Sequence, residues 1–177
     1  MDIAQHVVTE KGQSVDVDSW FLSATNSAGE KNYISPWHDV DPMVDDRSSI
    51  KGVIEMERGA TVIKSCALSF EHNPIMQETS VDKSGLLIHK VIEEPALFNY
   101  GFVPQTWSDS RWGGDGNPLD LVDLSSGQAK TTLTVCDFKV LGVLGHIDKG
   151  MLDYKIIVLD AKEANERGIL TLDDLKD

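Results

Sequence analysis

Gly114-Asp115-Gly116-Asn117-Pro118-Leu119-Asp120 is the stretch around which this 177-residue chain is organised. It sets two aspartates, Asp115 and Asp120, five residues apart on a turn. Gly116 gives the backbone freedom to turn and Pro118 removes it again, so the direction of the Asp120 side chain is fixed locally. Two close carboxylates raise each other's pKa by like-charge repulsion, whereas a bound divalent cation makes both stable as anions. The stretch therefore indicates a cation site, with an ordinary solvated turn as the alternative.

A second acidic segment lies downstream, in Asp148-Lys149-Gly150-Met151-Leu152-Asp153-Tyr154-Lys155. It repeats the five-residue aspartate spacing around a glycine and runs directly into the apolar residues 156–159. This apolar run predicts a strand, and side chains alternate between the two faces of a strand. Asp153 and Lys155 are therefore expected to point to the same face.

Three motifs follow one another in the middle and last third of the chain. NYGFVPQTW at 99–107 precedes GDGNPLD at 114–120, and DKGMLDYKIIVLD follows at 148–160. In this order and spacing they resemble the soluble family I inorganic pyrophosphatases, and ISPWHDV at 34–40 is similar to the eukaryotic branch. The resemblance runs from about Ile34 to the C-terminus. It implies hydrolysis of inorganic pyrophosphate to two phosphates by a metal-activated water.

Composition limits the classes of partner and the compartment. The formal net charge of -13 argues against nucleic acid and anionic membranes, which are bound through patches of Lys and Arg. A phosphorylated substrate would have to be met through metal ions. Cys66 and Cys136 are too few for a disulfide scaffold and form no CxxC pair, which indicates free thiols in a reducing compartment. The sequence has no apolar run of transmembrane length and no signal-like N-terminus, so a cytoplasmic location is expected.

The hydrophobic pattern predicts a mainly β fold. Short strands with turn signals between them favour a closed or partly closed antiparallel barrel. The resemblance implies a five-stranded OB-type barrel with flanking helices, an α+β fold. The strands expected from the pattern are 50–56, 61–68, 86–92, the hairpin partners 131–135 and 138–144, and 154–159.

The expected domain organisation is an N-terminal arm at 1–31 followed by a pyrophosphatase-like barrel domain at 32–177. The Ser-, Asn- and Gly-rich residues 23–29 predict a mobile arm, part of which docks through apolar residues between 15 and 21.

The last residues carry a helix-start signal. Thr171 followed by Asp174 is typical of a cap with an acidic first turn. The resemblance implies a further C-terminal segment with a Tyr-Lys pair that the printed sequence does not contain, so a natural short form and a fragment are both open.

The resemblance also implies the roles of individual residues. Mg²⁺ is the expected cofactor, because an acidic pocket binds pyrophosphate and phosphate only through ions that bridge carboxylate to phosphate. The implied metal ligands are all acidic: Asp115, Asp120, Asp148, Asp153 and, through water, Glu55. The implied substrate-binding residues are Lys64, Lys90, Tyr100 and Lys155, and the implied catalytic residues are Asn117, Tyr100 and Lys155. We expect the four aspartates to converge, although they come from two distant segments.

Four positions depart from the family pattern. Asn117 replaces an aspartate that is taken to be the catalytic base, and an amide can orient a water but cannot accept its proton. Cys66 replaces a glutamate, Ala96 a tyrosine, and Lys90 an arginine, whose bidentate fork is lost. Two functions are therefore carried forward: a magnesium-dependent inorganic diphosphatase, and a catalytically weak relative acting as a metal-binding partner or regulatory subunit. The expected protein partner is a second copy of the chain or an active subunit.

Overall fold

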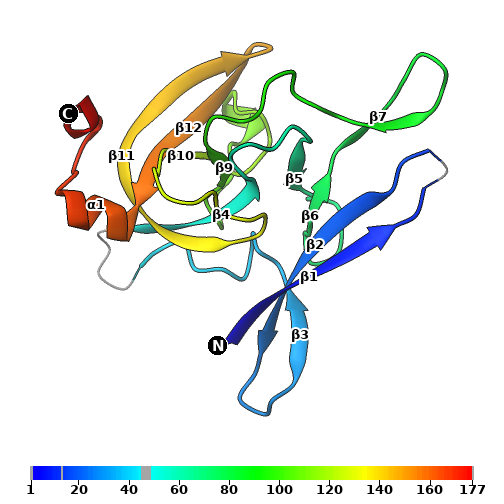
Figure 1. The fold of residues 1–177 in the computed structure, drawn as a ribbon, viewed down its shortest axis with the longest axis horizontal. Helices are drawn as coiled ribbons and strands as arrows, with labels where there is room; N and C mark the ends of the chain where they lie inside the picture. The colour runs from blue at the N-terminus through cyan, green and yellow to red at the C-terminus, as the bar shows by residue number, and fades with distance from the viewer. Residues whose placement is uncertain (1, 13, 45–48, 177) are drawn as a thin grey trace.

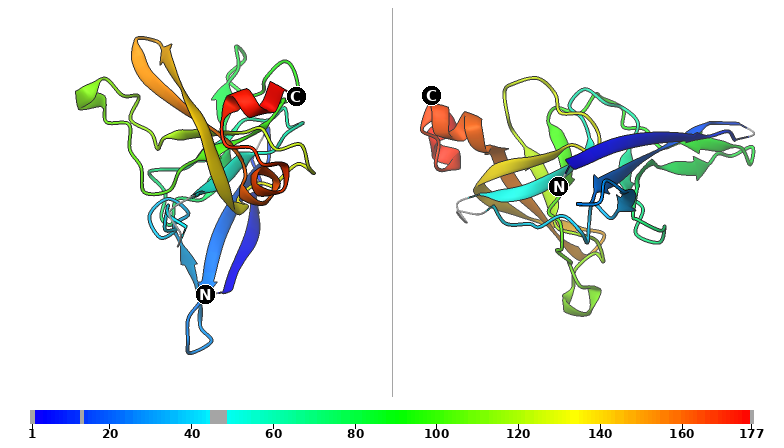
Figure 2. Two further views of the ribbon diagram at one scale, coloured as in Figure 1. Left: turned by 90° about the vertical axis from the view of Figure 1, so that its left-hand side faces the viewer. Right: turned by 90° about the horizontal axis from the view of Figure 1, so that it is seen from below.

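The computed structural model describes residues 2–12, 14–44 and 49–176. Strands form a closed five-stranded barrel, a five-stranded open sheet and a two-stranded hairpin (Figure 1). The open sheet lies on one side of the barrel, and helix α1 (Ala161–Arg167) lies with the C-terminal end on the opposite side (Figures 1 and 2). No helix in the described ranges is long and apolar enough to cross a bilayer.

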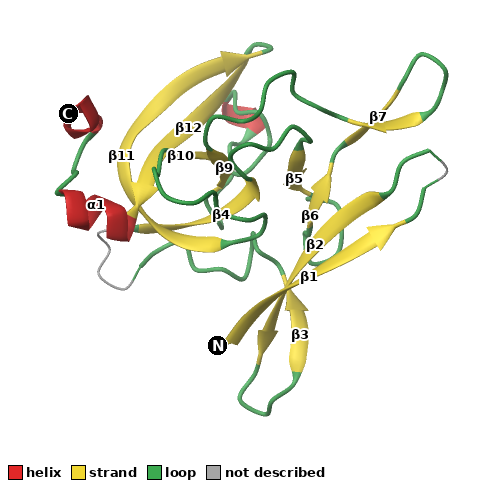
Figure 3. Cartoon of the chain, viewed as in Figure 1, coloured by secondary structure: helices red, strands yellow, loops and turns green. Residues whose placement is uncertain are grey.

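The barrel confirms the predicted fold class, mainly β with flanking helical segments (Figure 3). Its strands run in the spatial order β10-β12-β11-β4-β9, with β9 and β10 closing the ring. All neighbours are antiparallel except β10 and β12, which are parallel. The bounds are β4 (Ile50–Met56), β9 (Asn99–Phe102), β10 (Asp120–Asp123), β11 (Val135–Asp148) and β12 (Met151–Asp160). Among the described residues, the helical segments are α1 and two short 3₁₀ helices, η1 (Ser110–Trp112) and η2 (Leu172–Lys176).

The prediction that 131–135 and 138–144 pair as a hairpin is wrong, although 138–144 does lie in a strand. Residues 131–134 form a turn in which Leu133 has a positive φ of 65° and donates its N–H to the Ile54 carbonyl. Everything from Val135 to Asp148 is one strand, β11. The reversal comes later, at Lys149 and Gly150, whose φ values of 50° and 85° suit a two-residue hairpin loop.

The strand expected at 50–56 matches β4, whereas two others are shorter than expected. The run 61–68 contains only β5 (Lys64–Cys66), and 86–92 contains only β8 (Leu87–His89). Isolated bridges such as Val62 with Val91 take the place of a longer ladder. Apolar content continues beyond these strands because the flanking residues line the cavity described below, as Ile63 and Ile92 do.

The N-terminal segment is part of a sheet, which differs from the mobile arm expected there. Leu22 and Ala24 of β2 are buried, and the hydrophobic cluster around Leu22 also contains Val53 and Phe102 of the barrel. This shared core joins the open sheet to the barrel. The sheet has the order β1-β2-β6-β5 with β3 on β2. Its further strands are β1 (Asp2–Glu10), β2 (Val17–Thr25), β3 (Lys31–Ile34) and β6 (Ile75–Gln77), and β7 (Thr79–Val81) pairs with β8. The domain boundary between 31 and 32 stays a prediction.

A glycine and a bulge bring β4 and β9 together. A Cβ atom on Gly101 would lie 1.9 Å from the Val53 carbonyl oxygen, so only glycine permits this approach. The pairing shifts between Ile54 and Met56, which leaves Glu55 as the extra residue of a β-bulge. A bulge re-aims the side chain that it carries. Glu55 is thereby buried in the wall of a cavity at the end of the barrel.

Candidate active site

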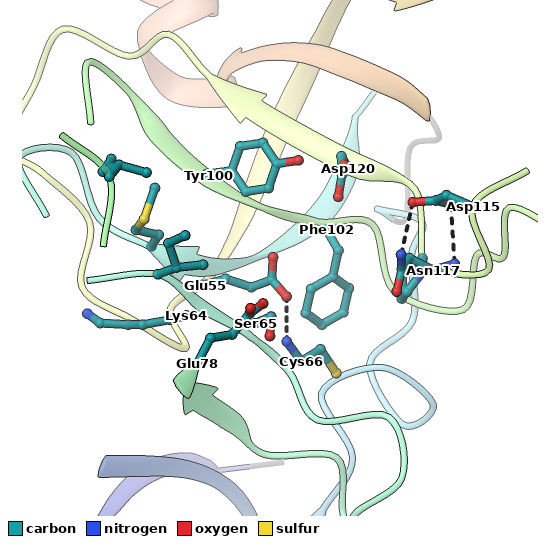
Figure 4. A pocket seen from close by; sticks show the side chains of 14 residues that line it. Glu55, Lys64, Ser65, Cys66, Glu78, Tyr100, Phe102, Asp115, Asn117 and Asp120 are labelled. Carbon is teal, nitrogen blue, oxygen red and sulfur yellow. Dashed lines mark hydrogen bonds between the residues drawn. The ribbon is translucent and has the colours of Figure 1, made fainter. Parts of the chain in front are cut away.

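A cavity of about 350 Å³ opens between the barrel and the short strand β5. Its walls come from β4, β5 and β9 and from the loop that precedes β10, and Figure 4 shows the side chains that line it. Four carboxylate side chains line the cavity: Glu55, Glu78, Asp115 and Asp120. Apolar side chains such as Phe102 fill its floor. The cavity is therefore both acidic and partly shielded from water.

The loop with the two aspartates is held in place by its own backbone. The Ser108 N–H donates to the Asn117 carbonyl at 2.7 Å, and the Gly116 N–H donates to the Ser108 carbonyl at 2.8 Å. Gly116 has a φ of 75°, as expected for the glycine that permits the turn. The Asn117 side chain donates from Nδ2 to Asp115 Oδ2 at 2.9 Å (Figure 4). Asn117 thus anchors Asp115 on the rim of the cavity.

Lys155 lies at the meeting point of three elements. Its Nζ atom donates to Asp153 Oδ1 at 2.7 Å, to the Tyr100 hydroxyl at 2.7 Å and to an Asp120 carboxylate oxygen. Strand register explains the contact, because Asp120 of β10 pairs with Lys155 of β12. Asp153 and Lys155 point to the same face of β12, as expected for two strand residues that are two positions apart. The structure thus brings Tyr100, Asp120, Asp153 and Lys155 to one point.

Electrostatics at this point follow from burial and from the shared ammonium. Burial raises the pKa of the Asp120 carboxyl and of the Tyr100 hydroxyl above their usual values. Burial acts in the same direction on Asp153, but hydrogen bonds, chiefly from Lys155, hold the pKa of Asp153 below its usual value. For Lys155, burial opposes the charge, yet the neighbouring carboxylates keep its pKa above the usual value. Lys155 is therefore a permanent cation that both aspartates share.

Glu55 occupies the inner wall. Its side chain accepts the Cys66 N–H at 2.7 Å (Figure 4). Burial is the main cause that raises the pKa of Glu55 to about 8, with the Asp120 charge adding to it. Burial thus favours the protonated form of Glu55, and a nearby cation would favour its anionic form.

Lys64 and Lys90 are each paired with a carboxylate. The Lys64 ammonium lies on the side of the cavity opposite Asp115 (Figure 4) and contacts Glu57 Oε2 at 2.6 Å. The Lys90 ammonium contacts Glu78 Oε2 at 2.7 Å, and its side chain is half-exposed. Lys64 lines the cavity, whereas Lys90 lies beside a residue that does.

Asp148 lies apart from the other predicted metal ligands. It ends β11, its side chain is 53% exposed, and it pairs with Lys149 at 3.6 Å. Asp153, from the same hairpin, contacts His146 at 3.4 Å as well as Lys155. Within residues 2–12, 14–44 and 49–176, no three acidic, histidine or cysteine side chains are grouped as a preformed metal cage. Convergence of all four aspartates stays a prediction.

Three residues around the cavity were not anticipated from the sequence. Glu57 and Thr132 hold the Lys64 ammonium, and Glu78 holds Lys90. The sequence contains one signal for the ion pair between Glu57 and Lys64, since the two residues stand on either side of the turn at Gly59. Nothing in the local sequence connects Thr132 with Lys64, because 68 positions separate them.

Comparisons with known proteins show the family to which the chain belongs. The family model described as "Inorganic pyrophosphatase" matches residues 70–177. The chain is 32% identical to a mouse inorganic pyrophosphatase over 154 residues, which cover 81% of this chain and 53% of the relative. It is 28% identical to inorganic pyrophosphatase 1 of Caenorhabditis elegans over 159 residues, covering 84% and 36% respectively. The chain therefore spans about half or less of the length of these relatives.

Solved structures share the whole fold. The type I inorganic pyrophosphatase of Toxoplasma gondii superposes with a TM-score of 0.78 at 25% identity, over 98% of this chain and 76% of that one. A recombinant inorganic pyrophosphatase of Trypanosoma brucei brucei gives a TM-score of 0.80 at 22% identity, over 98% and 54%. The N-terminal sheet is included in this similarity, since almost the entire chain is covered.

Proposed function

Since the chain belongs to the inorganic pyrophosphatase family, we propose that it hydrolyses inorganic pyrophosphate to two phosphates with Mg²⁺ as its cofactor. One observation carries the proposal: Tyr100, Asp120, Asp153 and Lys155 meet at one point from three separate strands. They do so beside a cavity that Asp115 also lines.

The donor set fits a hard divalent cation. Mg²⁺ prefers oxygen ligands, and the candidate ligands offer carboxylate oxygens throughout. Burial raises the pKa of Asp120, and a bound cation would act in the opposite direction by favouring the anion. The residues that would hold the metal are Asp115, Asp120 and Asp153, with Glu55 reaching it through water and Asp148 serving a further ion. Bound Mg²⁺ supplies positive charge against the phosphates and lowers the pKa of its own water.

The other residues of the site have roles that follow from their chemistry. Burial keeps the Tyr100 hydroxyl protonated, so Tyr100 can donate a hydrogen bond to a phosphate oxygen. Lys155 holds Asp120 and Asp153 in register and supplies positive charge beside them. The Asn117 amide can orient a water molecule at the cavity rim, but it cannot accept a proton.

A phosphate-release assay tests the proposal. The intact chain is incubated with pyrophosphate and Mg²⁺, and phosphate is measured with malachite green. We expect release well above the uncatalysed control, and much less from Asp120→Asn. Release at the control level by a folded chain that still binds Mg²⁺ would contradict the proposal.

That result would favour the second candidate, a metal-binding partner or regulatory subunit with little turnover. Two observations point to it: Asn117 stands where a base is expected, and the Lys64 ammonium is already paired with Glu57. The compartment and the oligomeric state, expected to be the cytoplasm and a dimer, stay predictions.

Replacing Asp120 with asparagine is expected to weaken Mg²⁺ binding several-fold, since the variant loses one charged ligand. The measurement is calorimetry, supported by melting curves, because a cation that binds only the folded chain raises the melting temperature by mass action. Asp137→Asn is the matched control: this aspartate is half-exposed and pairs with Lys51 at 3.9 Å. Equal effects of both substitutions, or a melting temperature indifferent to millimolar Mg²⁺, would contradict a metal site at Asp120.

A further inference from the structure

The Lys64 ammonium is buried and is already bonded to two side chains of the protein. A lysine ammonium carries three N–H bonds. Lys64 Nζ contacts Glu57 Oε1 at 2.8 Å, Glu57 Oε2 at 2.6 Å and Thr132 Oγ1 at 2.8 Å. It also lies 4.8 Å from the centre of the Trp20 ring. Its side chain is only 7% exposed, although Lys64 lines the cavity. Within the described residues, the polar contacts of this cation are therefore all made to Glu57 and Thr132, in a position that solvent hardly reaches.

Glu57 is itself fixed from two directions. Thr132 Oγ1 lies 2.7 Å from Glu57 Oε2, so the hydroxyl accepts from Lys64 and donates to Glu57. Thr132 is 4% exposed and cannot move aside easily. Glu57, Lys64 and Thr132 thus close a triangle of hydrogen bonds in which the carboxylate holds the ammonium through both of its oxygens.

The other cations near the cavity differ from Lys64 in their partners. Lys155 also uses three donors, but two of its acceptors are Asp120 and Asp153, the residues proposed for the metal. Lys90 makes one contact, to Glu78, and its half-exposed ammonium keeps free donors. Glu57 is not among the residues that line the cavity and has no proposed metal to bind. Among the residues that line the cavity, Lys64 is the one whose side chain contacts the Glu57 carboxylate.

We propose that Glu57 determines the affinity of this cavity for phosphate-type anions by withholding the Lys64 ammonium. An incoming phosphate oxygen can bond to Lys64 only after it displaces a carboxylate oxygen that already makes a charged, bidentate contact. The exchange replaces one charged hydrogen bond by another, so Lys64 adds little net affinity while Glu57 is present. The inference rests on the proposed function of the cavity and names a residue that limits it.

The test is a double-mutant cycle on Glu57 and Lys64. Glu57→Gln keeps the size of the side chain and frees at least one N–H of Lys64. The probe is methylenediphosphonate, a diphosphate analogue without a hydrolysable bridge, titrated by calorimetry at fixed Mg²⁺. We expect Glu57→Gln to bind the probe about ten-fold more tightly, the effect of one charge-assisted hydrogen bond. The gain should vanish in Glu57→Gln combined with Lys64→Gln.

The same cycle separates this mechanism from a general charge effect. A gain that persists without Lys64, or no gain at all in a folded Glu57→Gln variant, overturns the inference. Thr132→Val is an independent route if Glu57→Gln fails to fold, because it frees one donor of Lys64 and should give a smaller gain. Glu71→Gln is the charge control: this glutamate is 89% exposed and contacts His72 only through a 3.7 Å ion pair. It should leave the affinity unchanged.

Failure of the proposed function would remain distinguishable. The titration needs no turnover, so a chain that releases no phosphate can still show the Glu57 effect. Conversely, a chain that hydrolyses pyrophosphate but shows no change on Glu57→Gln retains the proposed function and loses only this inference.

Discussion

Replacing Asn117 with aspartate is expected to raise the turnover number for pyrophosphate hydrolysis by about ten-fold or more, since a general base typically adds roughly 10² to 10⁴ in rate. The position is suitable because Asn117 lines the cavity beside Asp115, and its loop is fixed by the Ser108 backbone. A carboxylate here can accept a proton from the attacking water, which the amide cannot. The measurement is the initial rate of phosphate release at saturating pyrophosphate and Mg²⁺.

The structure also predicts a side effect of this substitution. Asn117 Nδ2 donates to Asp115 Oδ2 at 2.9 Å, so an aspartate would place two carboxylates in contact. Like charges this close raise the pKa of the pair. As the pH is lowered, the variant should therefore begin to lose activity at a higher pH than the wild type does. Asn117→Ala is the control, because it removes the same hydrogen bond without adding a base. Equal turnover of Asn117→Asp and the wild type, with Mg²⁺ still bound, would contradict a missing base as the limiting defect.

Replacing Asp123 with alanine is expected to lower the free energy of unfolding by about 3–5 kcal/mol, the usual cost of breaking a buried ion pair from one side. The Asp123 side chain is fully buried and accepts from Asn99 Nδ2 at 2.8 Å and from the Ser125 N–H at 3.0 Å. Lys130 Nζ lies 3.4 Å away, with its own side chain 13% exposed. The substitution would leave a largely buried ammonium with Asp160 alone as its acidic neighbour. Urea unfolding curves measure the loss.

Two further variants control this prediction. Asp137→Ala removes a half-exposed aspartate of the same barrel, whose one ion pair spans 3.9 Å, and should cost less than about 1 kcal/mol. Asp123→Asn keeps acceptor oxygen for Asn99 and should cost less than the alanine variant. A loss for Asp123→Ala no larger than that for Asp137→Ala would show that the buried network does not support the fold.

The sequence pattern predicts part of the barrel and little of the N-terminal sheet, for physical reasons. The strands expected at 50–56, 138–144 and 154–159 lie within β4, β11 and β12, and the Lys149-Gly150 turn separates the last two. The barrel strands β9 and β10 were not among the expected strands, because four residues are too few to show a clear pattern. The N-terminal strand β2 instead buries small polar residues, among them Ser19 and Ser23. Buried serines look like loop residues in a sequence, because their burial depends on partners such as His6, 17 positions away.

The candidate site divides in a similar way. The spacing of Asp153 and Lys155 predicts that both point to one face, because strand alternation is a local property. Their meeting with Asp120 depends on the parallel register of β10 and β12, which no local pattern encodes. The contacts of Lys64 with Thr132 and of Lys90 with Glu78 were likewise not predictable, since long flexible side chains find their partners only in the folded state.

The parallel seam between β10 and β12 has a consequence for how the molecule assembles. Parallel neighbours need a long connection, and here the chain makes β11 before it returns as β12. Such distant pairings cost loop-closure entropy before any contact compensates for it. Asp120 and Lys155 sit side by side in this seam. Asp120 and Lys155 therefore come together only when the barrel has closed. Opening the barrel between β10 and β12 would keep the β11–β12 hairpin, with Asp153 and Lys155 on it, but would separate Lys155 from Asp120.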